Sequence, residues 1–406
     1  MDVIGNVKHQ TIKPPEEEEL PTSPGHLIFD ADFESGNLGK VEYCGNNEYD
    51  LYIRVDTCNQ KYRLWFHYSV TNAKVGQTCI FHIVNFSKGR SLYREGMGPV
   101  VRSTSRVNWT RLSQSQCYYW KGESGGYILS FTFKFDVDER YEFAYCFPYD
   151  YARMQSKIQS LPSSLVDRRV LAHTLQKRNI DLLTIGSGER HIVVMARVHP
   201  GESPASFIMD GFLDFITSEE CNIAKYLRDQ VTFKIIPMLN PDGVALGNYR
   251  CSLMGFDLNR HWRDTNPWAQ PGLHAVKAFL IGLEKEHPVD FCFDIHAHSL
   301  ATGAFMYGNV VSEDQQSEQQ AFPKIFSAFA EDFSLSKTNF NKDAVKSGTA
   351  RRVLRGLFPK SYTLEVSFYN YQKDLRSVPY TQKAYCELGE NLARAIAEYY
   401  RKYPTL

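Results

Sequence analysis

The sequence predicts two domains of different class: an N-terminal antiparallel β-sandwich, followed by an α/β domain with a mixed, largely parallel sheet and helices on both faces. Three observations predict this architecture. With 406 residues, the chain is longer than one ordinary hydrophobic core requires. Its first part alternates apolar and polar residues in short runs, which is typical of strands that bury one face. Its second part alternates apolar runs of strand length with helical patterns, which favours a parallel sheet covered by helices.

The N-terminal part divides into a tail and a β-domain. Residues 1–22 contain two adjacent prolines and the glutamate run 16–19 without apolar periodicity, and we expect an acidic, disordered tail. We expect the sandwich to cover residues 23–155. In its clearest strand, 127–137, every odd position is apolar or aromatic. Comparable runs separated by Gly, Asn and Ser turns predict about seven or eight strands in all, and they cover 51–55, 62–70, 79–86 and 141–147.

Residues 156–406 are expected to form the α/β catalytic domain. A linker or short helix covers 152–159, and Ser163 and Ser164 precede apolar residues in the manner of a capped helix start. The alternation that follows predicts strands at 191–198, 231–238 and 289–295 and helices at 203–216 and 272–286. Catalytic groups of such sheets gather at the carboxyl ends of the strands, so the polar residues directly after these runs are the candidates.

A pair of metal-ligating residues follows the first of these strands. His199 comes directly after the apolar run 192–198, and Pro200 and Gly201 force a turn that brings Glu202 beside it. An imidazole and a carboxylate at this spacing suit Zn²⁺. A catalytic zinc needs three protein ligands and a fourth position open to water, so a third donor must come from elsewhere in the chain.

The strand at 289–295 supplies the candidate third ligand. It ends on His296, so the three donors His199, Glu202 and His296 would meet at one edge of the sheet. His298, two residues further on, is the alternative. Asp294 is spaced to share a face with His296 and to orient its ring.

Glu365 is the candidate carboxylate for acid–base chemistry. In residues 362–369 the even positions are apolar, and the odd positions are polar apart from Tyr369, so Glu365 faces away from one apolar layer. Burying an unpaired carboxylate costs several kcal/mol, so a cation or a metal-activated water is expected beside it. A surface edge strand is the alternative reading.

Five stretches of this sequence resemble the cytosolic carboxypeptidases. They are HPGE at 199–202, NPDG at 240–243, NYRCSLMGFDLNRHW at 248–262, DIHAHS at 294–299 and YTLEVSFY at 362–369. The resemblance implies a zinc metallocarboxypeptidase that holds one Zn²⁺ per chain at His199, Glu202 and His296, with Glu365 as general base. It further implies removal of glutamates from polyglutamate side chains and from acidic C-terminal tails, as a tubulin deglutamylase.

The same resemblance implies roles for four other residues. Arg250 is expected to point at the scissile carbonyl and stabilise the oxyanion. Asn259 and Arg260 are expected to hold the free α-carboxylate of the substrate, a task that suits the planar guanidinium group. Asp257 fits an acceptor for the second nitrogen of a zinc-bound imidazole.

Specificity for glutamate is expected from a basic segment before Glu365. Residues 342–360 contain six basic residues against the single acid Asp343. The resemblance places an arginine of this segment at the base of the pocket for the terminal side chain. Arg351 is the first candidate and Arg352 the alternative.

Charge and cysteine content restrict the partners. The 46 basic residues balance the 46 acidic ones, which argues against nucleic acid or membrane as a partner. Nine cysteines without a Cys-x-x-Cys pair indicate reduced thiols. With no secretion leader and no apolar run of about 18 residues, we expect a soluble, cytoplasmic monomer. By resemblance, it would act on polyglutamylated tubulin or similar acidic tails at the cytoskeleton, centriole or ciliary basal body.

Two functions of other classes stay open at this point. A zinc N-acyl amino acid deacylase also uses His-x-x-Glu and a later histidine. A non-catalytic tubulin-binding module would follow if zinc were absent. The expected clamp at Asn259 and Arg260, together with the basic segment, favours an acidic polymeric tail.

Overall fold

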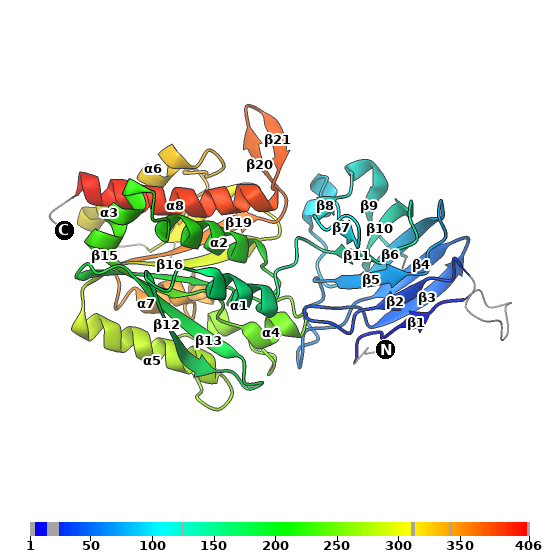
Figure 1. The fold of residues 1–406 in the computed structure, drawn as a ribbon, viewed down its shortest axis with the longest axis horizontal. Helices are drawn as coiled ribbons and strands as arrows, with labels where there is room; N and C mark the ends of the chain where they lie inside the picture. The colour runs from blue at the N-terminus through cyan, green and yellow to red at the C-terminus, as the bar shows by residue number, and fades with distance from the viewer. Residues whose placement is uncertain (1–4, 14–23, 124, 310–312, 341–342, 404–406) are drawn as a thin grey trace. The chain divides into compact units, whose positions relative to one another are not determined.

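The computed structural model describes residues 5–13, 24–123, 125–309, 313–340 and 343–403 (Figure 1). It divides into two compact units: Met1–Asp150 with Gly243–Gly255, and Tyr151–Asp242 with Phe256–Leu406. We expected the boundary near residue 155 and expected the second domain to contain 243–255. The structure instead begins the second unit at Tyr151 and gives the segment Gly243–Gly255 to the first.

The first unit contains two sheets of antiparallel strands, as predicted. In spatial order the six-stranded sheet consists of β1 (Gln10–Thr11), β2 (Ile28–Asp30), β5 (His67–Thr71), β11 (Tyr141–Ala144), β7 (Val100–Ser103) and β8 (Thr110–Arg111). The five-stranded sheet consists of β3 (Lys40–Gly45), β4 (Glu48–Tyr52), β6 (Thr78–Phe86), β10 (Tyr127–Lys134) and β9 (Cys117–Lys121). The pair β4–β6 is a parallel exception. The unit also contains η1 (Leu92–Glu95) and η2 (Gln114–Gln116).

Aromatic side chains form the core of this unit. Phe81 of β6 lies 5.5 Å from Phe131 of β10 and 5.5 Å from Phe143 of β11, so rings from both sheets meet. The described residues of this unit form more strands than the seven or eight that we expected for the sandwich. Several of the additional strands have only two to four residues, and a run that short cannot show the alternation of a strand in the sequence.

The expectation of a disordered tail over residues 1–22 is wrong for residues 5–13. Val7 and Ile12 are buried, and β1 pairs with β2. Two apolar side chains five positions apart are enough to attach this segment to the sheet, but they show no periodicity in the sequence. Residues 1–4 and 14–23, which include the glutamate run 16–19, lie outside the described part of the chain.

The second unit is built on one eight-stranded sheet. In spatial order its strands are β12 (Val166–His173), β13 (Asn179–Ile185), β15 (Val231–Ile236), β14 (Arg190–Ala196), β16 (Val289–His298), β19 (Lys360–Ser367), β17 (Ala304–Gly308) and β18 (Asn339–Phe340). Of its pairs, β14–β15, β14–β16, β16–β19 and β17–β18 are parallel, and three are antiparallel. This is the predicted mixed, largely parallel sheet.

The predicted helix after Ser163 and Ser164 is wrong. Residues Val166–His173 form the edge strand β12, antiparallel to β13. Most of the side chains of β12 are exposed or half-buried, so the strand lacks the apolar run that would have identified it in the sequence.

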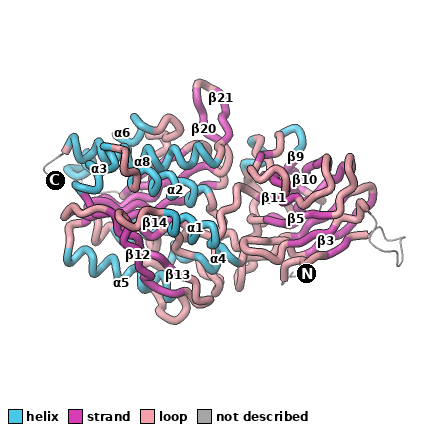
Figure 2. Tube along the Cα trace, in the orientation of Figure 1, coloured by secondary structure: helices cyan, strands magenta, loops and turns pink. Residues whose placement is uncertain are grey.

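Helices cover both faces of this sheet, as predicted (Figures 1 and 2). On one face lie α2 (Pro204–Ile216), α3 (Asn222–Gln230), α6 (Glu313–Phe329) and α8 (Gln382–Lys402). On the other face lie α5 (Pro271–Glu286) and α7 (Ala350–Leu354). A Cβ at Gly211 of α2 would lie 1.9 Å from the carbonyl oxygen of Cys386 in α8, so this glycine lets the two helices touch.

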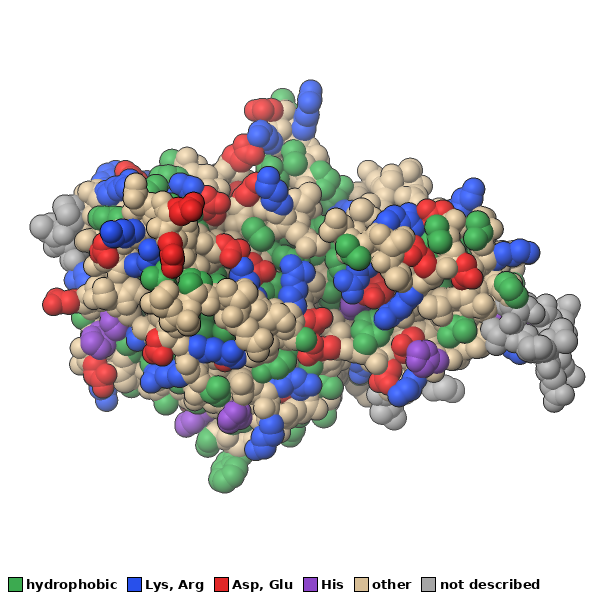
Figure 3. All heavy atoms as spheres, viewed as in Figure 1, with side chains coloured by type: hydrophobic (Ala, Val, Ile, Leu, Met, Phe, Trp, Pro, Cys, Tyr) green, Lys and Arg blue, Asp and Glu red, His purple; other side chains and the backbone are tan. Residues whose placement is uncertain are grey.

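The remaining elements are short. They are α1 (Tyr151–Ser160), α4 (Pro241–Ala245), η3 (Leu258–Arg260), η4 (Ala344–Lys346), and the hairpin of β20 (Asn370–Lys373) and β21 (Arg376–Pro379). Among the described helices, none is both long enough and apolar enough to span a bilayer. All nine cysteines are free thiols. Acidic and basic side chains are interspersed over the face seen in Figure 3.

Candidate active site

Three parallel neighbouring strands of the second unit carry the candidate site at their carboxyl ends. The strand β14 ends at Ala196, just before His199, and it pairs in parallel with β16, which carries His296 near its end. The next strand, β19, pairs with β16 so that Glu365 is the register partner of His296. The fold therefore brings the predicted ligands and the predicted base to one edge of the sheet.

Arg197 shapes the turn between the two ligands of the first loop. Its φ is 58°, in the left-handed region that side chains rarely adopt, and the residue is buried. Its Nη2 donates to the carbonyl oxygen of Pro200 at 2.5 Å, and its Nη1 donates to Ser206 Oγ at 2.8 Å. These bonds hold the backbone that carries His199 and Glu202. This role was not predicted from the sequence, although an arginine at the end of an apolar run is unusual.

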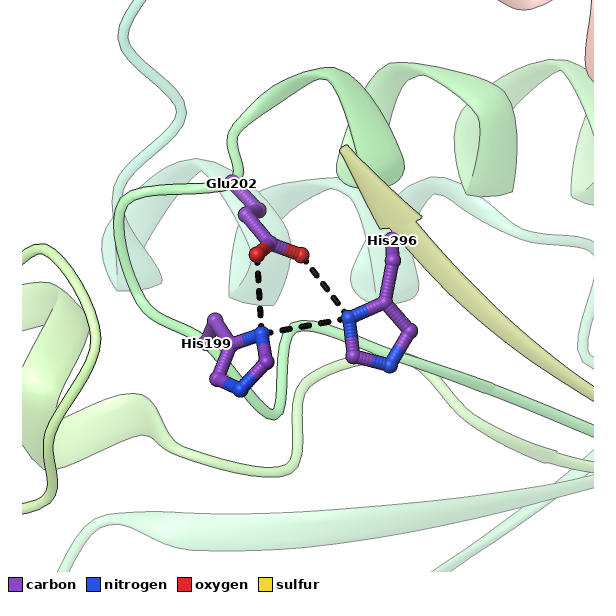
Figure 4. A group of neighbouring side chains, drawn as sticks. All are labelled: His199, Glu202 and His296. Atoms are coloured by element: carbon purple, nitrogen blue, oxygen red, sulfur yellow. Dashed lines mark hydrogen bonds and ion pairs between the residues drawn. The ribbon is translucent and has the colours of Figure 1, made fainter. Parts of the chain in front are cut away.

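His199, Glu202 and His296 converge on one point (Figure 4). Glu202 Oε1 lies 2.8 Å from His199 Nδ1, and Glu202 Oε2 lies 2.9 Å from His296 Nδ1. The two Nδ1 atoms are 3.2 Å apart. All three side chains are buried, and their ligand atoms lie within 4.8 Å of one another. Two imidazole nitrogens and a carboxylate oxygen form a donor set that fits Zn²⁺.

Two aspartates orient the imidazole rings. His199 Nε2 lies 3.1 Å from Asp257 Oδ1, and His296 Nε2 lies 2.8 Å from Asp294 Oδ2. An Nε2–H group that donates to a carboxylate leaves Nδ1 as the coordinating nitrogen in each ring. The alternative ligand His298 is engaged elsewhere, because its Nδ1 accepts from the backbone N–H groups of Leu300 and Ala301.

The charges inside the cluster reinforce one another. Burial alone would raise the pKa of Glu202, but the adjacent His199 and His296 hold it well below its usual range. Burial alone would lower the pKa of His296, but the carboxylates of Asp294 and Glu202 hold it well above its usual range. A buried centre that carries this much carboxylate charge is suited to a divalent cation.

Glu365 faces this centre from a central strand. Because β19 lies between β16 and β17 in the sheet, the reading of Glu365 as part of a surface edge strand is wrong. The other residues of β19 are buried, whereas Glu365 is half-exposed. Its strand neighbours are His296 on one side and Phe305 on the other. As register partners on neighbouring strands, Glu365 and His296 project to the same side of the sheet.

The whole chain matches known proteins. Residues 29–146 match the family described as "Cytosolic carboxypeptidase N-terminal domain", and residues 151–405 match "Zinc carboxypeptidase". The chain belongs to the zinc carboxypeptidase family. It is a metallocarboxypeptidase, and this assignment sets aside the deacylase and the non-catalytic module.

The relatives cover almost the entire chain. The sequence is 49% identical to Cytosolic carboxypeptidase 6 of Mus musculus, over 98% of this chain and 78% of the relative. It is 50% identical to the protein of that name from Homo sapiens, over 94% of this chain and 80% of the relative. Among solved structures, a metallo-carboxypeptidase from Burkholderia cenocepacia has a TM-score of 0.81 at 25% identity, covering 93% of this chain and 100% of that one.

Arg351 of this zinc carboxypeptidase is buried. Its Nη1 donates to the carbonyl oxygen of Gly308 and, at 3.2 Å, to Asn309 Oδ1. Burial, together with the charge of Arg352, lowers the pKa of Arg351 to about 10, so it remains protonated at neutral pH. The neighbouring Arg352 is held differently: its Nε and Nη1 atoms are buried and bond to none of the described residues.

Lys346 and Tyr307 lie close to Arg351, and no role was predicted for either of them from the sequence. Lys346 Nζ lies 4.0 Å from the centre of the Tyr307 ring, and Arg351 Cζ lies 5.8 Å from it. Burial lowers the pKa of Lys346, and the charge of Arg351 acts in the same direction, whereas Glu365 opposes them. Lys346 and Arg351 of the zinc carboxypeptidase thus share the ring of Tyr307, and the charge of Glu365 acts on Lys346. Lys346 belongs to the basic segment that was recognised in the sequence, but nothing in the sequence distinguishes it from its neighbours.

Asn259 and Arg260 lie beside the metal ligands in η3. Asn259 Nδ2 is 3.3 Å from His296 Nε2, and Asn259 Oδ1 accepts from the backbone N–H of Ala350 at 2.9 Å. Arg260 Nη1 donates to the carbonyl oxygen of Asn259 at 2.9 Å. Asn259 thus lies against the ring of His296 and bonds to the start of α7, the helix that carries Arg351.

Arg250 is the one predicted site residue that the first unit carries. Its backbone N–H donates to Asp56 Oδ2 at 2.7 Å. Its guanidinium carbon lies 5.8 Å from the centre of the Tyr62 ring. Its backbone and its guanidinium thus both contact residues of the sandwich unit.

Proposed function

We propose that this zinc carboxypeptidase removes C-terminal glutamates from polyglutamate side chains and from acidic C-terminal tails, with polyglutamylated tubulin as a substrate. The observation that carries the proposal is the group of cations in the segment before Glu365: Lys346, whose pKa responds to the charge of Glu365, together with Arg351 and Arg352. Substrates ending in glutamate present two carboxylates, one at the terminus and one on the side chain. Each carboxylate calls for a cationic partner in a partly desolvated pocket.

We propose one Zn²⁺ per chain, held by His199 Nδ1, a Glu202 carboxylate oxygen and His296 Nδ1. Zinc bound there would supply Lewis acidity, which activates a water and polarises the scissile carbonyl. Asp257 and Asp294 keep the two Nε2–H groups engaged, so the Nδ1 lone pairs stay directed at the centre. The donor set and the burial of the cluster support this assignment.

Glu365 serves as general base and then as general acid in the proposed reaction. Its carboxylate takes the proton of the attacking water, and the resulting carboxyl group returns that proton to the nitrogen of the leaving amino acid. Arg250 donates to the carbonyl oxygen as negative charge develops on it. Loss of one such donor typically reduces kcat by roughly 10² to 10³.

Arg260, together with Asn259, is proposed to bind the terminal α-carboxylate, which restricts the enzyme to chain ends. Arg351 is proposed to bind the side-chain carboxylate of the terminal glutamate. Its anchoring by Gly308 and Asn309 supports this choice over Arg352, because a pre-positioned guanidinium loses less freedom on binding.

We propose that the enzyme acts as a cytoplasmic monomer, at the cytoskeleton and at the centriole or ciliary basal body, on proteins and not on nucleic acid or membranes. The relatives named as cytosolic enzymes support this location. The balanced charge of the chain leaves the attraction of acidic tails to local groups of cations.

Mass spectrometry of tubulin tails tests the proposed function. Purified protein with its zinc content measured is incubated with glutamylated and unmodified tails, and with an N-acyl amino acid. We expect stepwise loss of 129-Da glutamate residues from the acidic ends, abolished by a chelator and by Glu365→Gln. Unchanged tails in the presence of stoichiometric zinc would overturn the substrate assignment.

A further inference from the structure

Asp56 is a buried carboxylate of the first unit that no step of the proposed reaction uses. It is 1% exposed. Its Oδ1 accepts from the backbone N–H of Tyr249, and its Oδ2 accepts from those of Arg250 and Cys251, each at 2.7 Å. Burial raises the pKa of Asp56, and these three donors act against that rise. Three short N–H bonds to one carboxylate fix the backbone on both sides of Arg250.

Neighbouring residues hold the same segment at further points. Arg54 Nη2 donates to the carbonyl oxygen of Leu246 at 2.6 Å, and Thr57 Oγ1 donates to Asn248 Oδ1 at 3.0 Å. Farther along, Asn59 Nδ2 donates to the carbonyl oxygen of Gly255 at 2.9 Å.

Glycines let the two stretches of backbone touch. Gly247 and Gly255 have φ of 71° and 79°, and a Cβ at either would lie within 2.5 Å of a carbonyl oxygen, that of Gly36 or Cys58. Residues 243–255 are thus bound along their length to residues of the sandwich.

The attachment of this segment matters for catalysis because the segment contains Arg250. Arg250 is the proposed oxyanion donor, and such a donor is effective only if its N–H groups are held within a fraction of an ångström of the developing charge. An arginine side chain has four flexible bonds, so its reach is defined only when the backbone from which it starts is fixed. Asp56 fixes that backbone.

We propose that Asp56 is a positioning residue for Arg250. The inference rests on the proposed function, because it requires Arg250 to act on the substrate carbonyl. Asp56 itself touches no substrate. It acts through the peptide units of residues 249–251, and its removal should therefore affect the rate of the chemical step more than substrate affinity.

The test compares Asp56→Asn with Glu142→Gln in the full-length zinc enzyme. Glu142 is a matched control, because it is also a largely buried carboxylate of the sandwich and accepts from Arg102 Nη2 at 2.7 Å. Its partners are His67, Arg102 and Arg140, all outside residues 243–255, so its loss destabilises the unit without releasing the segment. Hydrogen exchange of a peptide spanning 249–251, zinc content, kcat and KM are measured for both variants and for Arg250→Ala.

For Asp56→Asn we expect faster amide exchange at 249–251, unchanged zinc content, a kcat lower by about 10- to 10²-fold and a KM within about twofold of wild type. Glu142→Gln should retain wild-type kcat and exchange. The double variant Asp56→Asn/Arg250→Ala should be no slower than Arg250→Ala, because a positioning residue has nothing left to position.

Three results would overturn the inference. They are an unchanged kcat in Asp56→Asn, a fall of equal size in Glu142→Gln, and fully multiplicative losses in the double variant. If Asp56→Asn does not fold, Asn248→Ala replaces it, since Asn248 Nδ2 donates to the carbonyl oxygen of Cys251 at 2.9 Å, and the same non-additivity with Arg250→Ala is required. A wild-type enzyme that cleaves no C-terminal glutamate overturns the proposed function itself, a result distinct from an active wild type with a fully active Asp56→Asn.

Discussion

Replacement of Arg351 by methionine should remove most of the preference for C-terminal glutamate. Methionine keeps much of the volume of the side chain and deletes its charge. Hydrogen bonds to charged groups contribute about 1.5–3 kcal/mol each, and a guanidinium meets a carboxylate with two of them. At the lower limit this is about 3 kcal/mol, which corresponds to a loss of at least about 10²-fold in kcat/KM for a substrate ending in glutamate.

The substitution is also expected to lower the stability of the fold. Arg351 Nη1 donates to the carbonyl oxygen of Gly308 and to Asn309 Oδ1, and both acceptors lose that partner in the variant. A buried unsatisfied acceptor costs about 1–3 kcal/mol. Asn309 Nδ2 keeps its bonds to the carbonyl oxygens of Arg351 and Ser361. We therefore expect a folded protein with a lower Tm, and stability must be measured beside activity.

The assay compares matched peptides that end in glutamate or glutamine, which differ in charge and hardly in shape. We expect Arg351→Met to reduce kcat/KM for the glutamate peptide by at least about 10²-fold and to leave the glutamine peptide within a few fold. Arg352→Met is the parallel variant. If the glutamate-to-glutamine ratio survives in Arg351→Met but collapses in Arg352→Met, Arg352 holds the substrate. If the ratio survives in both, the cationic pocket is refuted.

Three further predictions concern the base, the metal and pH. Glu365→Gln should bind zinc and substrate normally and lose about 10³-fold or more in kcat; calorimetric binding with a chemical-step rate near wild type would contradict the base assignment. Asp294→Asn should weaken zinc binding by roughly 10- to 100-fold, because the ring of His296 loses the acceptor that orients it; competition with a chelator measures this, and an unchanged affinity would refute it. Burial raises the pKa of Asp332 from 3.8 to about 6, although the hydrogen bond from Tyr380 Oη opposes the rise. Between these two pH values the folded state binds more protons than the unfolded chain, so the stability of the fold decreases as the pH rises. Asp332→Asn should therefore increase the free energy of unfolding at pH 7.5 by about 1–3 kcal/mol, which raises the Tm, and should leave the Tm unchanged near pH 3.5. An equal Tm at pH 7.5 would show that the carboxylate carries no burial penalty.

The strands that carry the site could be predicted because they are buried on both faces. All residues of β14 except the first are buried, as are all but the ends of β16, so each reads as a continuous apolar run that stops at a polar residue. The edge strand β12 could not be predicted in this way, because solvent covers much of its surface. Sequence patterns therefore identified the centre of the sheet better than its margin.

The convergence of the candidate metal ligands could be predicted for a related reason. His199 and His296 each stand where an apolar run ends, and parallel strands place such ends together. Lys346 and Tyr307 gave no comparable indication. Their proximity to Glu365 depends on how the chain passes β17 and enters α7, and sequence spacing carries no information about that path.

Asp56 shows that two stretches far apart in the sequence can belong to one structural unit. It lies 193 positions before Tyr249, in a β-domain with no catalytic constellation of its own. The match to the zinc carboxypeptidase family runs without interruption from 151 to 405, yet the structure assigns Gly243–Gly255 to the sandwich unit. A boundary drawn along the sequence therefore separates Arg250 from the carboxylate that holds its backbone.

The assignment of residues 243–255 to the sandwich unit argues against an N-terminal domain that is only a separate binding module. A separate binding module would be attached through side chains on its surface and would leave the catalytic chain complete. Here the contacts are main-chain hydrogen bonds to a buried carboxylate and glycine-mediated backbone approaches, which are the contacts of a protein interior. Without the sandwich, the N–H groups of residues 249–251 would be left to water, and Arg250 would start from an unrestrained loop. The sandwich and the segment 243–255 are therefore best regarded as one folded element.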